Sequence, residues 1–482
     1  MKQIPQTLKN LFQNKTGFIL LAELLTLFII TFGFLIYTAY TNTLNGDERE
    51  HVYASYLVYN GYIPYRDFFE HHHPLLWYVF QPIIHFFINS AHIWYAARTF
   101  SLLLIFINCI FLFKLSRLIS TAKDYPWLVL ILAVCPHCVF ISETEFRPDT
   151  LMMTMFIGGL YYYFKAQQTA PQKNLNIAFI LFFLAFMALQ KICFLILPIA
   201  VLTIYLLYKQ IFSMKNIFIA SLLPLILAIL YIGCLHHTNS LKDYVELNWL
   251  LNMKIHFGIR YPAHQTLYYY TANLLALLTL LTPANTRLKH LAFISLGLSF
   301  TLTYVFVGAF RHYWLPLYPF FALLCAYYIS VLQQKLKILL LAAIIYLISA
   351  NNLTYNKELR RYTPLNSFVY LTENILNLSH PDDLIIGCIG SLGGLRLDAT
   401  GYYWFGRNYI ALLDNHYFKR HELPDGDKIV KARHPKIVCA EDWTHCMTED
   451  YKFTLGCRSV PTYDRNYLEQ HYTNMGFIYV RK

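Results

Sequence analysis

Two short acidic segments of the chain hold side chains suited to acid–base chemistry. The first contains Asp47 and Glu48, and the second contains Glu145, Arg147 and Asp149. A positioned carboxylate can take up or release a proton during a reaction, which typically contributes about 10²–10⁴-fold to the rate. Taken alone, either segment also fits the solvated start of a loop, so the remaining residues have to decide between the two interpretations.

Three cations in other parts of the chain could bind an anion. Arg98, Lys191 and Arg311 lie at or near the ends of apolar runs, and Arg311 is followed by His312 and Tyr313. Arginine binds a phosphate as a bidentate fork, and lysine binds it as a point charge. Together the three could hold a phosphate, although each singly is equally well explained by a long side chain that reaches the lipid headgroups.

The segment Gly61–Trp77 crowds charged, imidazole and aromatic groups into a short stretch that includes Arg66, Asp67 and His73. A simple connecting loop does not need this composition. The run His71–His73 suggests a metal site at first sight. Consecutive residues do not share a face of a helix, however, so three adjacent histidines are poor zinc ligands without donors from elsewhere. We therefore predict no metal site here.

Long apolar runs must position these residues. The chain has 482 residues, of which 57% are hydrophobic and 14% charged, whereas soluble domains usually carry about 25% charged residues. Runs of about 18 or more apolar residues match the hydrocarbon thickness of a membrane. We predict an all-α polytopic membrane domain over residues 1–350 with about eleven spans, at 17–40, 93–113, 125–142, 150–164, 175–190, 192–208, 216–235, 266–283, 291–310, 314–332 and 338–350.

The distribution of charge gives these spans an orientation. If the N-terminus is cytoplasmic, the cytoplasmic segments hold 14 Lys and Arg residues and one acid. Their net charge of +13 (14 − 1) exceeds the net charge of +12 of the whole chain. The positive-inside rule therefore accounts for the basic excess, and nucleic acid is not needed as a partner. The loops 41–92 and 236–265 and the C-terminal segment then lie outside. Short helices are expected near 48–60 and 74–90.

The composition of the sequence changes after about residue 350. Charge rises, and a helix is expected at 365–378, strands at 384–389, 436–439 and 477–480, and a further helix at 467–472. Alternation of this kind predicts a small α/β domain over 351–482, outside the cytoplasm. Four of the ten cysteines lie in this domain, where disulfides are permitted, although the sequence does not decide their pairing.

The order of the motifs resembles the C-type glycosyltransferases. The motifs are Asp47-Glu48, Pro64-Tyr65-x-Asp67, His73-Pro74-Leu75-x-Trp77 and Arg147-Pro148-Asp149. Lys191 before a Leu-Pro run, Arg311–Pro319 and Arg98 also look like the protein-mannosyltransferase-like branch, which includes bacterial transferases that add aminoarabinose to lipid A. One departure concerns His73, since many relatives have a lysine there that helps to hold the carrier phosphate.

The resemblance implies an inverting glycosyltransferase whose donor sugar is carried on a polyprenyl phosphate. The acceptor would be a hydroxyl of lipid A, a surface glycan or a protein. Asp47 is the candidate base, with Glu48 as an alternative or an orienter. Substrate binding would fall to Arg66, Asp67, His73, Arg98, Glu145, Arg147, Asp149, Lys191, Arg311 and Tyr313.

The same resemblance places the enzyme in the bacterial inner membrane, in contact with membrane lipids. The sequence identifies no cofactor, and assistance by a divalent cation stays open. Two other functions also remain open. A polysaccharide polymerase or ligase would use diphosphate-linked oligosaccharides. A lipid-linked sugar transporter would show inverted repeats, and the sequence shows none.

Overall fold

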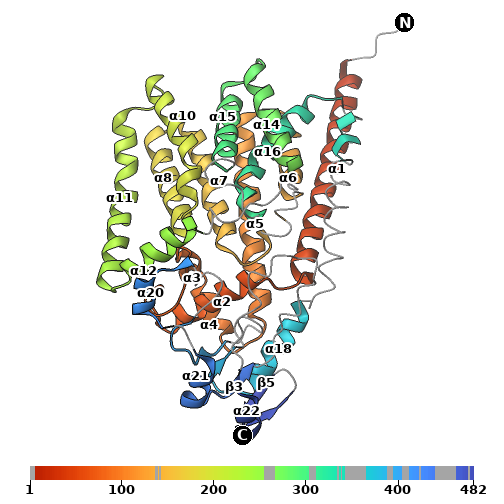
Figure 1. Cartoon of the computed structure of the whole chain (residues 1–482). Helices are drawn as coiled ribbons and strands as arrows, with labels where there is room; N and C mark the ends of the chain where they lie inside the picture. Colours follow the sequence, from red (N-terminus) through yellow and green to blue (C-terminus); the bar gives the residue numbers. More distant parts are fainter. Residues whose placement is uncertain are drawn as a thin grey trace.

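We describe the protein from a computed structural model of the whole chain (Figure 1). The structure describes residues 6–135, 139, 143–254, 266–302, 311–333, 336–337, 339–341, 343, 365–387, 395–403, 412–422, 425–439, 463–475 and 478–482. The predicted Arg311 side chain and most of the predicted span 338–350 lie outside these described residues.

A bundle of apolar helices forms the larger part of the molecule. Helices overlap each of the first ten predicted spans, although α6 is shorter than its predicted span and one span is divided into two helices, α9 and α10. The bounds are α1 Gln6–Thr41, α5 Ile93–Ile119, α6 Tyr125–Val134, α7 Pro148–Ala166, α8 Pro171–Ala188, α9 Ile192–Leu195, α10 Leu197–Tyr208, α11 Met214–His237, α14 Thr266–Leu281, α15 Thr286–Phe300 and α16 Tyr318–Ser330. The 3₁₀ helix η4 Arg311–Leu317 precedes α16. Four described helices, namely α1 over Ile19–Thr41, α5, α8 and α11, are long and apolar enough to cross a membrane. Only 6% of the apolar window of α11 is buried inside the protein, as expected for a helix that faces lipid.

A pair of glycines lets α7 pack closely between its neighbours. A Cβ added at Gly159 would lie 2.5 Å from the ring of Phe182 in α8, and one at Gly158 would lie 3.1 Å from the ring of Phe111 in α5. Small residues allow transmembrane helices to approach in this way. The close packing holds the middle of α7, the helix whose first turn carries Asp149, between α5 and α8.

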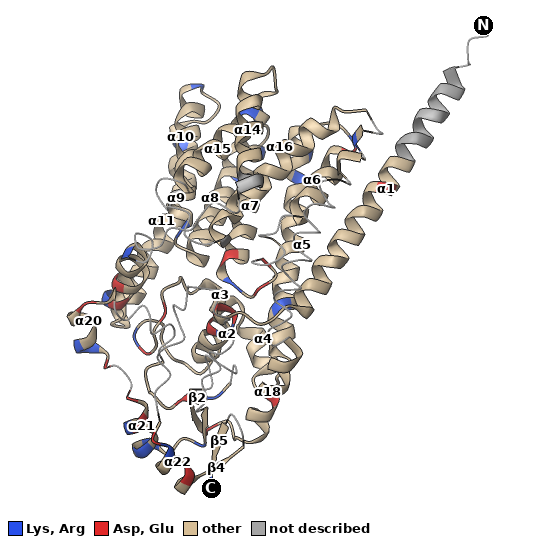
Figure 2. Ribbon diagram, turned by 45° about the vertical axis from the view of Figure 1, so that its right-hand side comes forward, with Lys and Arg blue, Asp and Glu red and all other residues tan. Residues whose placement is uncertain are grey.

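The segment between α1 and α5 forms three short helices, α2 Gly46–Tyr59, α3 Leu75–Val79 and α4 Gln81–Phe87. They confirm the helices expected near 48–60 and 74–90. A second segment, α12 Leu241–Val245 followed by the π-helical turn η2 Glu246–Leu251, lies in the other long loop. Figure 2 shows the bundle largely without charged residues along its length, whereas acidic residues gather around α2 and in the C-terminal part.

The C-terminal part contains a five-stranded sheet, which agrees with the predicted α/β elements. Its strand order is β2-β1-β3-β5-β4, with β1 parallel to β2 and β3, and β5 antiparallel to β3 and β4. The elements are α18 Leu365–Asn377, β1 Leu384–Ile386, β2 Leu397–Asp398, α20 Asn415–Arg420, α21 Gly426–Arg433, β3 Ile437–Cys439, α22 Arg465–His471, β4 Tyr472–Asn474 and β5 Ile478–Arg481. Cys439 forms a disulfide, a bond that forms and persists in oxidising compartments.

This C-terminal part packs directly on the loops of the bundle. The amide of Phe69 donates to the carbonyl of Tyr403 at 2.9 Å, and the Tyr53 hydroxyl donates to the carbonyl of Arg396 at 3.2 Å. The start of α1 and the C-terminal sheet lie at opposite ends of the bundle (Figure 1). The segment with α2 to α4 therefore lies between the apolar helices and the sheet.

Candidate active site

Arg147 binds the carboxylates of both acidic segments. Its guanidinium lies 2.6 Å from Asp47, 3.3 Å from Glu145 and 3.4 Å from Asp149. Its backbone is extended, and Pro148 then occupies the first turn of α7, where a missing N–H costs nothing. The Arg147 side chain is only 6% exposed, whereas that of Asp47 is 39% exposed. Asp47 is therefore the carboxylate of this cluster that other molecules can reach.

Asp47 lies in the first turn of α2, which Asn45 caps. Burial acts to raise the pKa of Asp47, but the positive charge of Arg147 is the largest opposing influence, and the pKa lies below its usual value. The carboxylate is therefore ionised at neutral pH and can accept a proton or a hydrogen bond.

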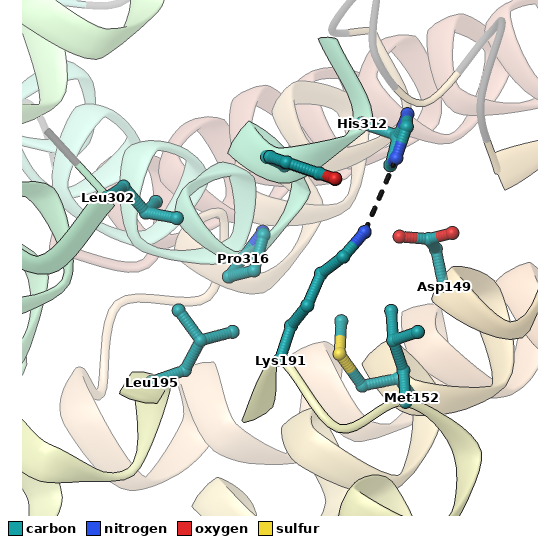
Figure 3. Close-up of a pocket in the computed structure, with 9 residues that line it drawn as sticks. Asp149, Met152, Lys191, Leu195, Leu302, His312 and Pro316 are labelled. Atoms are coloured by element: carbon teal, nitrogen blue, oxygen red, sulfur yellow. Dashed lines mark hydrogen bonds between the residues drawn. The ribbon is translucent and has the colours of Figure 1, made fainter. Parts of the chain in front are cut away.

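Lys191 points into a pocket beside this cluster (Figure 3). The pocket is narrow and partly open to solvent. Its lining residues are Asp149, Met152, Leu189, Lys191, Leu195, Leu302, His312, Tyr313 and Pro316. The Lys191 Nζ lies 3.7 Å from the centre of the Tyr313 ring and 3.4 Å from His312 Nε2. Burial lowers the pKa of Lys191 to about 8, although Asp149 opposes the shift. Lys191 therefore offers a positive charge at pH 7 inside a mostly apolar pocket.

His312 connects the pocket to the acidic cluster, and the sequence analysis did not select it as a site residue. Arg147 Nη2 lies 3.3 Å from His312 Nε2, the same nitrogen that Lys191 approaches. Its position between Arg311 and Tyr313, both of which were selected, was the signal that could have identified it. The side chains of Asp47, Arg147, His312 and Lys191 thus form one continuous polar chain.

Glu145 completes the cluster from the buried side. It accepts hydrogen bonds from the side-chain amide of Asn45 at 3.2 Å and from Arg147. Burial raises the pKa of Glu145, and the charge of Arg147 only partly opposes the shift. Glu145 therefore links Asn45, the N-cap of α2, to Arg147, which precedes α7.

Glu48 and Arg98 form a buried ion pair, and neither residue lines the pocket. Arg98 Nη2 lies 2.6 Å from Glu48 Oε2, and Arg98 also donates to the carbonyls of Ala39, Asn42 and Thr43. The other Glu48 oxygen accepts the amide of Phe146 at 3.1 Å. With both side chains about 1% exposed, the geometry does not support Arg98 as a phosphate ligand or Glu48 as the base. The pair instead fixes the end of α1 against α2.

Arg66 and Asp67 bind each other and lie apart from the cluster. Their side chains meet at 2.7 Å, and Asp67 also accepts the amide of Ile63 at 2.7 Å. These contacts close the turn that carries Tyr65 at a positive φ of 71°. The structure therefore does not place the predicted substrate ligands Arg66 and Asp67 with Asp47 or Lys191.

His73 is also occupied by protein contacts. Its Nδ1 donates to the carbonyl of Phe186 at 2.6 Å, so Nε2 accepts from the Tyr244 hydroxyl at 2.9 Å. Burial lowers the pKa of His73 to about 4, so the ring is neutral at pH 7. A neutral ring with both nitrogens bonded to the protein offers no charge and no free donor to a phosphate.

The sequence matches no protein-family model, and no curated protein matches it. The fold is similar to two crystal structures of ArnT, an aminoarabinose transferase of the C-type glycosyltransferase class, from Cupriavidus metallidurans. The structure bound to undecaprenyl phosphate has a TM-score of 0.55 at 9% identity, and the apo structure has a TM-score of 0.50 at 10% identity. Each match covers 76% of this chain and 70% of that chain. The predicted resemblance to this class is confirmed at the level of the fold.

Proposed function

We propose that this membrane protein is a glycosyltransferase that moves a sugar from a polyprenyl-phosphate carrier to a hydroxyl acceptor at the outer face of the membrane. The observation that carries the proposal is the contact between Asp47 and Arg147 beside the pocket of Lys191. It places a reachable carboxylate, the candidate base, beside the pocket of Lys191, whose charge could offset that of a leaving phosphate.

The carrier phosphate would bind at Lys191. The amine lies in an apolar pocket, where its interaction with a phosphate is screened less than in water. Leu195, Leu302 and Met152 would contact the first isoprenoid units, because they line the same pocket. The similar ArnT fold binds undecaprenyl phosphate, and this supports the same class of carrier here.

Asp47 would act as the general base. The acceptor oxygen attacks the anomeric carbon as the bond from that carbon to the phosphate oxygen breaks. The acceptor proton passes to Asp47, and the polyprenyl phosphate leaves with the bonding electron pair. Lys191 would offset the charge that develops on the leaving phosphate, an electrostatic contribution that is often the largest in catalysis. A single displacement of this kind inverts the anomeric centre.

Arg147 and Glu145 would hold Asp47 in its orientation, and Asp149 and Tyr313 would shape the space for the sugar beside Lys191. The acceptor would approach Asp47 from its exposed side. The charge asymmetry of the loops supports an inner-membrane location with the C-terminal part outside the cytoplasm. The acceptor would then be a lipid, glycan or protein hydroxyl of the cell envelope.

A transfer assay with purified protein tests the proposal. The protein in nanodiscs receives radiolabelled sugars on polyprenyl phosphate together with envelope lipid, glycan and protein fractions. The proposal expects label to move to a hydroxyl acceptor in wild type and not in Asp47→Asn. Use of diphosphate-linked oligosaccharides alone would identify a polymerase or ligase, and movement of intact donor across liposomes without transfer would identify a transporter. Either result would overturn the proposal.

A further inference from the structure

A second polar cluster lies one helical turn from Asp47, and the proposed transfer reaction does not use it. Glu50 of α2 meets Glu70, His71 and His72 of the loop that precedes α3. One donor atom from each of these four residues lies within 4.8 Å of the donor atoms of the other three. Three of the residues are buried and His72 is nearly so, which sets the cluster apart from acidic groups on an open surface.

The two carboxylates are buried without full compensation. The side chains of Glu50 and Glu70 are 2% and 1% exposed. Glu50 Oε1 and Glu70 Oε2 accept no hydrogen bond from the part of the chain that the structure describes. Two carboxylates in this state are costly, because each loses its hydration and repels the other. A cation between them would offset both effects.

The spacing of the donors fits a small metal ion. His71 Nδ1 lies 3.8 Å from Glu50 Oε1 and 3.8 Å from Glu70 Oε1, and His72 Nδ1 lies 2.7 Å from Glu70 Oε1. Ligands of tetrahedral zinc lie about 3.4 Å apart, since Zn–N and Zn–O bonds are about 2.0–2.2 Å. Small displacements of these side chains would therefore bring all four donor atoms to bonding distance of one ion.

The backbone explains why the sequence predicted otherwise. The run His71–His73 is not helical, so the argument that neighbouring histidines diverge on a helix does not apply. Glu70 Oε1 accepts the amides of His71 at 2.9 Å and His72 at 3.2 Å. This turn brings both rings to the same carboxylate, and Glu50 arrives from α2 as the outside ligand.

We propose that Glu50, Glu70, His71 and His72 bind a divalent transition metal, with zinc favoured by the donor set. Two imidazoles and two carboxylates are typical zinc ligands, whereas calcium and magnesium prefer oxygen donors alone. The ion would tie the loop before α3 to α2. Its role is to hold the helix that carries Asp47, and it takes no part in the bond-breaking step.

Metal analysis of the full-length protein tests the site independently of sugar transfer. Wild type is purified without chelator, and its zinc content is measured by plasma mass spectrometry. We expect about one equivalent per chain by the four-ligand count of a closed site. The variants Glu50→Gln and His71→Asn should lose the metal, whereas His92→Asn, an exposed histidine at the start of α5, should retain it.

A titration covers the case in which the variants fold poorly. Wild type is stripped with a chelator, and its thermal midpoint is followed as zinc or magnesium is added. Zinc should raise the midpoint and magnesium should not, and in Glu50→Gln the apparent affinity for zinc should fall at least about tenfold. The proposal is overturned if wild type purified without chelator holds no zinc and shows no zinc-dependent rise. It is equally overturned if Glu50→Gln and His71→Asn bind zinc as wild type does.

Discussion

The carboxylate of Asp47 and the guanidinium of Arg147 lie 2.6 Å apart, although one follows α1 and the other precedes α7. Arg147 also contacts Glu145 and Asp149, so a single buried cation organises three carboxylates. Of these, Asp47 is the most exposed. The contact therefore presents one ionised carboxylate to incoming molecules and keeps the other two as supports.

Replacing the proposed base should abolish most transfer without unfolding the protein. Asp47→Asn keeps the shape of the side chain but cannot accept the proton, so we expect kcat to fall by about 10²–10⁴-fold. Asp67→Asn is the matched control, because Asp67 pairs with Arg66 away from the pocket. Equal transfer rates in wild type and Asp47→Asn would remove Asp47 from the mechanism.

The pocket lysine should impose an alkaline limit on the enzyme. The pKa of Lys191 is lowered to about 8, so its charge is present below this pH and is lost as the pH rises through it. We expect kcat/KM for the carrier-linked donor to fall above about pH 8, since this parameter reports the free enzyme. Arginine stays charged at high pH, so Lys191→Arg should shift the fall upward. An unchanged pH profile in Lys191→Arg would argue against Lys191 as the titrating group.

The ion pair between Arg98 and Glu48 should support stability and not carrier binding. Arg98→Met leaves Glu48 buried and uncompensated, which typically costs about 3–5 kcal/mol. We expect a large fall of the thermal midpoint in a fixed detergent, and a partial recovery in the double variant with Glu48→Gln. An unchanged midpoint with loss of undecaprenyl-phosphate binding would restore Arg98 as a phosphate ligand.

The C-terminal part should be held on the second loop by α20. Arg420 contacts Asp243 at 2.7 Å and Glu246 at 2.6 Å, and His421 contacts Asp243 at 2.9 Å. Arg420→Ala should raise amide hydrogen exchange in residues 412–422, measured by mass spectrometry. Lys428→Ala is the control, since its pair with Asp425 is exposed and local to α21. Equal exchange in both variants and wild type would show that these ion pairs do not hold α20.

The apolar runs and the alternation of strands and helices predicted most of the fold, because both patterns are local in the sequence. The shared location of Asp47 and Arg147 could also be inferred, since the charge of the loops assigns both to one side of the membrane. Their direct contact could not, because it depends on how α7 packs against α5 and α8.

Two of the predicted site residues, Arg98 and His73, have partners that are distant in the sequence. Arg98 carries no local sign that Glu48 and three carbonyls take up its donors. His73 likewise gives no hint of Phe186 and Tyr244. In both cases a charged or polar side chain at a membrane boundary predicted a ligand, and tertiary contacts that the sequence does not encode locally satisfied it instead.

The most direct test of the account is a structure of this protein with undecaprenyl phosphate bound, determined by cryo-electron microscopy in nanodiscs. We expect a phosphate oxygen within about 2.7–3.2 Å of the Lys191 Nζ, with the isoprenoid chain leaving past Leu195 and Leu302 and Asp47 facing the open side of the pocket. A phosphate held elsewhere, with Lys191 and Asp47 on separate surfaces, would contradict the proposed site.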